Sequence, residues 1–92
     1  MEKRIGAAII LIQEKTSIPE LNEILNQNSD IIIARQGVPL CNRNLNIISL
    51  VLEGTTNDIS SLTGKIGKLK HIQVKSVLTK TEVENGNKRN MG

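Results

Sequence analysis

The side chains that could bind a metal ion are few in this sequence of 92 residues. It contains one cysteine, Cys41, and one histidine, His71. A closed zinc site takes four ligands, usually with Cys-x-x-Cys or His-x-x-x-His spacing, and neither spacing occurs here. Cys41 and His71 could share a metal only across a symmetric interface, with one pair from each subunit. We expect a surface histidine, a loop cysteine, no metal and no other cofactor.

No pattern typical of a catalytic site is present. The sequence has no Gly-x-Ser-x-Gly elbow, no Gly-x-x-x-x-Gly-Lys loop and no Gly-x-Gly-x-x-Gly fingerprint. Glu20 and Glu23 are one helical turn apart, but carboxylates at a helix start usually stabilise its dipole rather than act as acid and base. Gly64 to Gly67 lie late in a predicted helix, at the negative end of its dipole, which disfavours an anion. We predict that the protein is not an enzyme.

Basic residues give two further candidates for binding. Lysines 65, 68, 70, 75 and 80 come with no acidic residue between them, within a net charge of +3. They could attract an anion, but we interpret them as a solvated helix end and strand face. Because the chain has no Phe, Tyr or Trp, it has no stacking platform for bases, and we expect no direct nucleic-acid binding. Arg35 could bind a carboxylate across an interface or, equally, protect an edge strand from aggregation.

The element around which the chain must be organised is the apolar run 5–12. It is too short to cross a bilayer, which takes about 20 apolar residues. Its odd and even positions are both apolar, so we predict a central strand that is covered on both faces. The full strand is predicted over 4–13, and residues 45–53 are predicted as a second strand of this kind.

The remaining elements are predicted from the spacing of apolar residues and from the turn-forming residues between them. Apolar spacing of three and four predicts one helix from about 18 to 28, with Thr16 or Ser17 as its cap, and another over 58–69, capped by Thr56. Residues 31–36 and 71–80 read as strands, the latter with a mixed face typical of an edge. Residues 37–44 read as the hairpin connection. We attribute Gly64 and Gly67 to close approach of a neighbouring backbone.

This order predicts an α+β ferredoxin-like βαββαβ sandwich, with a four-stranded antiparallel sheet and two helices on one face. Residues 1–80 form the domain, and 81–92 form a polar, disordered tail. The second sheet face would expose an aliphatic patch, which monomers rarely tolerate. We therefore expect a homodimer or homotetramer formed through the sheet. The alternative is that the tail covers this face, although its apolar residues are only Val83 and Met91.

One cysteine and no apolar secretory leader favour a reducing, cytoplasmic compartment, with no membrane attachment.

Four segments of the sequence carry a resemblance to a known family. They are Ala34–Pro39, Ile47–Gly54, Asp58–Leu69 and Val74–Ser76, and the most specific part is Leu-Thr-Gly-Lys-Ile-Gly within the third. Across residues 4–80 the sequence resembles the iron-only hydrogenase system regulator family, which are small ACT-like proteins.

The resemblance implies an ACT-like fold similar to the C-terminal domain of the nickel-responsive repressor, oligomeric assembly and a regulatory role beside hydrogenase maturation proteins. The turn 14–19 lacks the glycine of amino-acid-binding ACT domains, and one histidine does not supply a nickel site. Our leading hypothesis is a homo-oligomeric module that senses a small ligand at a subunit interface, lined by Glu14, Lys15, Thr16 and Arg35. The rival hypothesis is an interaction or assembly module without a ligand, acting on hydrogenase-system proteins.

Overall fold

The computed structural model describes residues 2–83. Two helices and four strands make up this part of the chain. In chain order they are β1 (Lys3–Ile12), α1 (Ile18–Gln27), β2 (Ile32–Leu40), β3 (Leu45–Gly54), α2 (Thr56–Gly67) and β4 (Ile72–Val83). Single 3₁₀ turns at Lys15–Ser17, Ser29–Ile31 and Cys41–Arg43 connect them.

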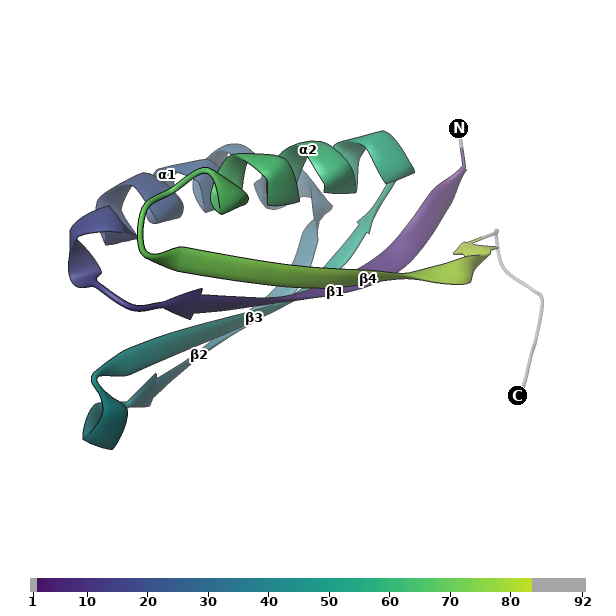
Figure 1. Cartoon of the computed structure of the whole chain (residues 1–92). Helices are drawn as coiled ribbons and strands as arrows, with labels where there is room; N and C mark the ends of the chain where they lie inside the picture. Colours follow the sequence, from purple (N-terminus) through teal and green to yellow (C-terminus); the bar gives the residue numbers. More distant parts are fainter. Residues whose placement is uncertain (1, 84–92) are drawn as a thin grey trace.

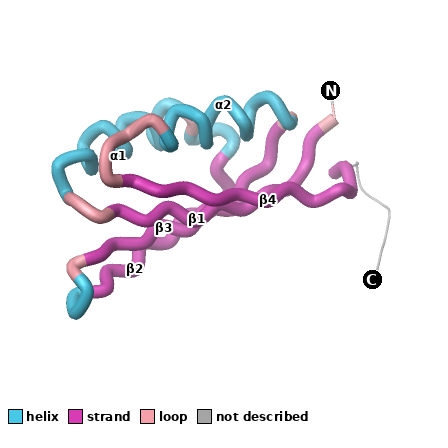
Figure 2. Tube along the Cα trace, viewed as in Figure 1, coloured by secondary structure: helices cyan, strands magenta, loops and turns pink. Residues whose placement is uncertain are grey.

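The strands form one antiparallel sheet in the order β2-β3-β1-β4. Both helices lie on the same face of this sheet, and the opposite face has no layer over it in the described part of the chain (Figure 1). Figure 2 shows the same two layers, with helices above and strands below. This is the predicted ferredoxin-like βαββαβ sandwich, and β1 and β3 occupy the predicted central positions.

The core lies between the helices and the inner face of the sheet, and it is entirely aliphatic. Alternate residues of the central strands point toward the helices, so one helix stripe meets one side of each strand. The side chains that are almost completely buried are Ile10, Leu21, Leu25, Leu50, Leu52, Ile59, Leu62 and Ile66. Because no aromatic residue is available, many branched side chains from both layers fill this volume.

The predicted cap position is confirmed for α1, at Ser17, and is wrong for α2. Thr55, not Thr56, is the cap of α2: its Oγ1 accepts a hydrogen bond of 3.0 Å from the amide of Asp58. The Asp58 carboxylate in turn accepts one of 3.2 Å from the Thr55 amide, which completes a capping box. Ser17 precedes α1 but makes no side-chain cap, because its hydroxyl has a partner elsewhere in the fold.

The explanation offered for the helical glycines is also wrong. A Cβ at Gly64 would meet no atom within 4 Å, and one at Gly67 would meet only Val74 Cγ1, at 3.6 Å. No backbone approaches either position closely. Close approach occurs at Gly6 in β1 instead, where a Cβ would lie 3.1 Å from both the Val77 carbonyl oxygen and Leu78 Cδ2. The lack of a side chain at Gly6 thus allows β1 and β4 to pair closely, with the Ile59 side chain packed over this position.

Both edge strands of the sheet are irregular, because β4 also shifts its register against β1, between Arg4 and Gly6. β2 continues through Pro39 to Leu40, beyond its predicted end at 36, and its register shifts between Ile32 and Ala34. Proline has no N–H and is tolerated in a sheet mainly at an edge, and a bulge disrupts the ladder. β4 is the other edge, as predicted, and it runs to Val83, past the expected domain boundary at 80. The predicted tail beyond Val83 lies outside the described residues.

The sheet surface that faces away from the helices is called the open face below. Ile9 and Val77 are exposed by 47% and 67% there. The strand registers place the following residues on it: Ile5, Ala7, Ile9, Leu11, Ala34, Gln36, Val38, Leu40, Leu45, Ile47, Ser49, Val51, Glu53, Gln73, Lys75 and Val77. The structure thus shows the surplus aliphatic surface that the sequence predicted. Neither α1 nor α2 is long and apolar enough to span a bilayer.

Candidate functional site

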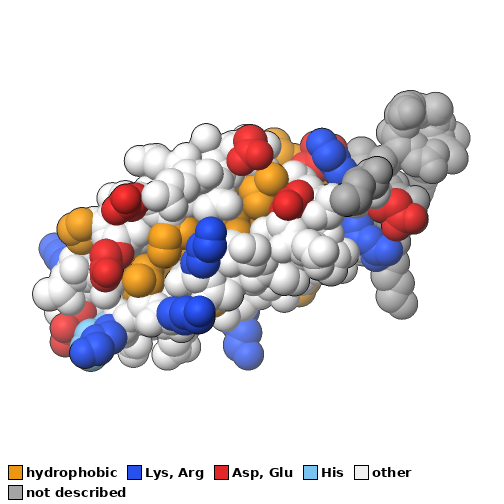
Figure 3. All heavy atoms as spheres, turned by 90° about the horizontal axis from the view of Figure 1, so that it is seen from above, with side chains coloured by type: hydrophobic (Ala, Val, Ile, Leu, Met, Phe, Trp, Pro, Cys, Tyr) orange, Lys and Arg blue, Asp and Glu red, His pale blue; other side chains and the backbone are white. Residues whose placement is uncertain are grey.

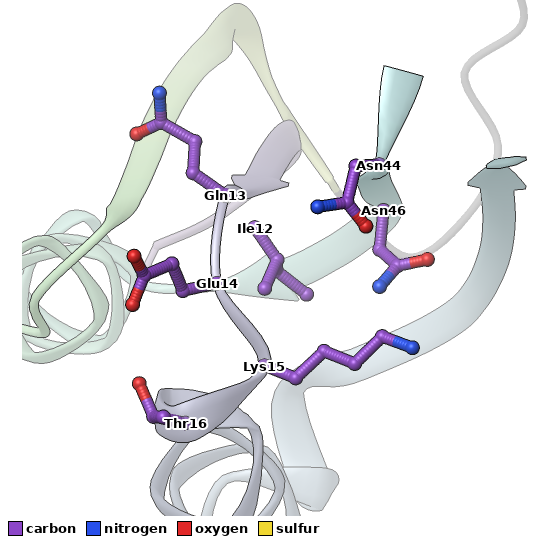
Figure 4. Close-up of a pocket in the computed structure, with 7 residues that line it drawn as sticks. All are labelled: Ile12, Gln13, Glu14, Lys15, Thr16, Asn44 and Asn46. Carbon is purple, nitrogen blue, oxygen red and sulfur yellow. The ribbon is translucent and has the colours of Figure 1, made fainter. Parts of the chain in front are cut away.

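A polar hollow lies where β1 ends and the chain turns toward α1 (Figure 4). It measures about 420 Å³, within the range of small-molecule sites. This cavity is called the turn hollow below. Its lining consists of Ile12, Gln13, Glu14, Lys15, Thr16, Asn44 and Asn46. Three of the predicted ligand residues, Glu14, Lys15 and Thr16, are therefore brought together.

The lining residues divide by direction around the Ile12 side chain. Lys15 extends toward the side where Asn44 and Asn46 lie, whereas Glu14 and Thr16 extend to the opposite side (Figure 4). An ammonium group beside amide donors suits a carboxylate or phosphate oxygen, and a carboxylate beside a hydroxyl suits a donor group. The hollow offers binding groups of both kinds but, among the described residues, no nucleophile paired with a base.

Asn44 and Asn46 were not singled out in the sequence. They reach the hollow because β3 pairs with β1 in a register that sets Asn46 opposite Ile12. Asn44 has a left-handed backbone, with φ of 54°, which asparagine tolerates better than most residues. The Asn42-Arg43-Asn44 run gave a turn signal, but the contact with residues 12–16 depends on strand pairing and cannot be read from local sequence.

The turn that lines the hollow is fixed to the connection between α2 and β4 by three contacts. The Gln13 amide donates a hydrogen bond of 2.8 Å to the His71 carbonyl. The Ser17 hydroxyl, which is 5% exposed as a residue, donates one of 2.9 Å to the Lys70 carbonyl. His71 Nε2 lies 3.6 Å from Glu14 Oε1, with both side chains about half exposed. The turn is thus a rigid wall rather than a free loop.

A second hollow, of about 390 Å³, lies on the other side of this turn. It is lined by Thr16, Ser17, Glu20, Lys68, Leu69, Lys70 and His71. Basic side chains gather at this end of the helical layer, together with acidic ones (Figure 3). The mixed charge agrees with the interpretation of the lysines as a solvated helix end, and we assign no ligand to this hollow.

Arg35 does not line the turn hollow. Its position in β2 faces the helical layer, and its Nη2 donates a hydrogen bond of 3.4 Å to Asn22 Oδ1 of α1. The structure therefore separates Arg35 from Glu14, Lys15 and Thr16 within one subunit. In residues 2–83 no group of three or more His, Cys, Asp or Glu side chains could hold a metal ion.

Comparison with protein families gives a match over most of the chain. The model of the TM1266-like family, described as "Iron-only hydrogenase system regulator, putative", matches residues 4–76. The chain belongs to the TM1266-like family. The resemblance inferred from the sequence segments is thereby confirmed, and the family description is that of a regulator rather than an enzyme.

Solved structures agree with membership of the TM1266-like family. The uncharacterized protein TM1266 from Thermotoga maritima is 34% identical, with a TM-score of 0.81 over 86% of this chain and 100% of that one. An unknown protein from Galdieria sulphuraria is 9% identical, with a TM-score of 0.56 over 94% of this chain and 48% of that one, and it shows the fold alone. No curated protein matches.

Proposed function

We propose that this chain is a non-enzymatic regulatory module of the iron-only hydrogenase system that works as a homo-oligomer and senses a small polar ligand in the turn hollow. Membership of the TM1266-like family supports the regulatory role. The observation that supports ligand binding is the hollow itself, in which Lys15, Asn46 of β3 and Asn44 of the turn before it surround the apolar side chain of Ile12. This combination of one apolar surface and a few convergent polar groups is typical of ligand sites.

The position of the hollow also suits a sensor that reports through assembly. Ile12 follows Leu11, and Asn44 and Asn46 flank Leu45, and both of these leucines belong to the open face. A subunit packed on the open face would therefore border the hollow. A bound ligand would then stabilise or weaken the contact between subunits, which is how binding at one site is coupled to an assembly.

The test is a ligand screen by thermal melting. Melting is followed by circular dichroism, because the chain has no Trp or Tyr and a hydrophobic dye would bind the open face. Amino acids, nucleotides and divalent metal ions are screened at millimolar concentration. A ligand at about 100 times its Kd stabilises the folded state by about 2.7 kcal/mol, a shift of several degrees. The absence of any shift would contradict the proposal.

Variants then locate the site. Lys15→Ala and Asn46→Ala should each remove most of the ligand shift, whereas Lys65→Ala, an exposed lysine of α2, should retain it. Arg35→Ala belongs in the same series, because Arg35 was predicted to contact the ligand and lies outside the hollow. If Arg35→Ala also loses the ligand-induced shift in melting temperature, Arg35 reaches the ligand from a neighbouring subunit.

The alternative function is an interaction module without a ligand, and the exposed aliphatic open face is the observation that favours it. Such a module would bind a hydrogenase maturation protein through this surface. Pull-down with those proteins separates the two functions: capture by the wild type, lost on Ile9→Glu, in a protein with no ligand shift would favour the interaction module.

A further inference from the structure

We infer that the open face is an isologous interface: a second copy of this chain packs the same sheet face against it, so that the two sheets form the inner layers of a four-layer dimer. This names the surface by which the proposed homo-oligomer forms. This inference depends on the proposed function only for the identity of the partner, which is taken to be another copy of the chain. Three properties of the open face support it, namely its area, its relief and its charge.

The area is sufficient for a specific interface. Four strands about 4.8 Å apart and ten residues long, at about 3.3 Å per residue, give a flat footprint of roughly 600 Å². Two such faces in contact bury about 1,200 Å², which reaches the range of specific complexes at 1,200–2,000 Å².

The open face is uneven rather than flat. Ile9 and Val77 are exposed on it, and together with Ala7 and Lys75 they line a shallow hollow of about 180 Å³. A second hollow, of about 360 Å³, lies over Ala34 and Ser49 between β2 and β3. In an isologous contact each copy presents the same surface, so the exposed side chains of one copy can enter the second hollow of the other.

The charge pattern also suits a second copy rather than a polar partner. The three central cross-strand rows of the open face end at Val77, Lys75 and Gln73 on β4. Lys75 is the one charged side chain in these rows, and it lies at the edge. Charges are depleted in the cores of interfaces and tolerated at their rims. The middle row also contains Ser49 and Gln36 beside Ile9, and the rows on either side of it, around Val51 and Ile47, are mostly aliphatic.

The chain beyond the described residues is a poor alternative cover. Residues 84–92 contain one large apolar side chain, Met91, among Asn, Gly and charged residues. Nine extended residues make a strip about 30 Å long and about 5 Å wide, roughly a quarter of the footprint. This segment therefore cannot replace a second copy, even if it lies on the open face.

The mass of the full chain in solution is the first test. Light scattering coupled to size exclusion, detected by refractive index, should give at least twice the 10.1 kDa of one chain. Ile9→Glu should raise the dissociation constant at least about 100-fold, because each dimer would bury the added carboxylate twice. Ser61→Glu, which adds the same charge at an exposed position of α2, should leave it unchanged. A 10.1 kDa particle at millimolar protein would overturn the inference.

The second test detects contacts between copies directly. It uses the unmodified chain, so it does not require a substituted variant to fold. In a mixture of isotopically labelled and unlabelled full chains, filtered NOE spectra should connect methyl groups of Ile9, Val51 and Val77 between copies. Contacts confined to the helices, or to β4 pairing edge to edge, would overturn the inference. A dimer with these contacts and no ligand shift would contradict ligand sensing alone, and a monomer with a ligand shift would contradict the interface alone.

Discussion

The Ser17 hydroxyl donates a hydrogen bond of 2.9 Å to the main-chain carbonyl of Lys70, 53 residues later in the chain. It joins the start of α1 to the segment between α2 and β4, and it is one of the three contacts that fix the β1–α1 turn. The bond also explains why α1 begins without a side-chain cap: the hydroxyl that could cap the helix satisfies a carbonyl of another element.

Ser17→Ala should lower the free energy of unfolding by about 1 kcal/mol, because it removes the part-buried hydrogen bond to the Lys70 carbonyl. Urea denaturation followed by circular dichroism measures this change. Ser61→Ala, at an exposed position of α2, is the control and should change the stability by less than about 0.5 kcal/mol. Equal effects of the two substitutions would show that the Ser17 bond does not contribute.

Thr55→Ala should destabilise the protein by about 1 kcal/mol, since it removes the cap of α2 and half of the capping box. Thr56→Ala is the matched control, because Thr56 is the adjacent exposed threonine within the first turn. Alanine is the better helix former, so this second substitution should be neutral or slightly stabilising. The reverse order of the two effects would place the cap at Thr56, as the sequence alone suggested.

Gly64→Ala should raise the free energy of unfolding by about 0.5–1 kcal/mol. The position is inside α2, exposed, and has space for a methyl group, so the gain is the helix propensity of alanine over glycine. Gly6→Ala should have the opposite sign, because its methyl group would press on the Val77 carbonyl of the adjacent strand. Thermal melting of both variants checks the pair, and a stabilising Gly6→Ala would contradict the tight approach of β1 and β4.

Glu14→Gln should change the stability by less than about 0.5 kcal/mol at neutral pH. Glu14 and His71 are 55% and 49% exposed, and solvent screens such pairs. The neighbouring contacts, from the Gln13 amide and the Ser17 hydroxyl, keep the turn in place without this pair. A loss above about 1 kcal/mol would show that the pair, rather than those two hydrogen bonds, fixes the turn.

Sequence patterns predicted the architecture well because the relevant signals are local. The run 5–12 is apolar at every position except Gly6, which favours a central strand, and β1 occupies that place in the sheet. The two helix caps could be predicted less well. Thr55 and Thr56 are adjacent and either side chain can cap a helix, so the cap depends on where the chain leaves β3. The Ser17 hydroxyl makes its hydrogen bond with a residue 53 positions away and not with the helix that it precedes.

Only those residues of the candidate site that are close together in the sequence could be predicted. Glu14, Lys15 and Thr16 are consecutive and lie in one turn, so they share a hollow by continuity of the chain. Asn44 and Asn46 join them through the β1–β3 register, which no local pattern encodes. Arg35 was grouped with them as a strand-end cation, but β2 continues past it and directs the guanidinium toward Asn22.

Both edges of the sheet carry interruptions that act against the addition of another strand. Pro39 has no N–H to donate to a further strand along β2, and β2 shifts its register next to Ala34. On the other side, β4 shifts its register against β1 between Arg4 and Gly6. A long regular edge is the usual template for uncontrolled strand pairing, and the sheet thus presents none on either side.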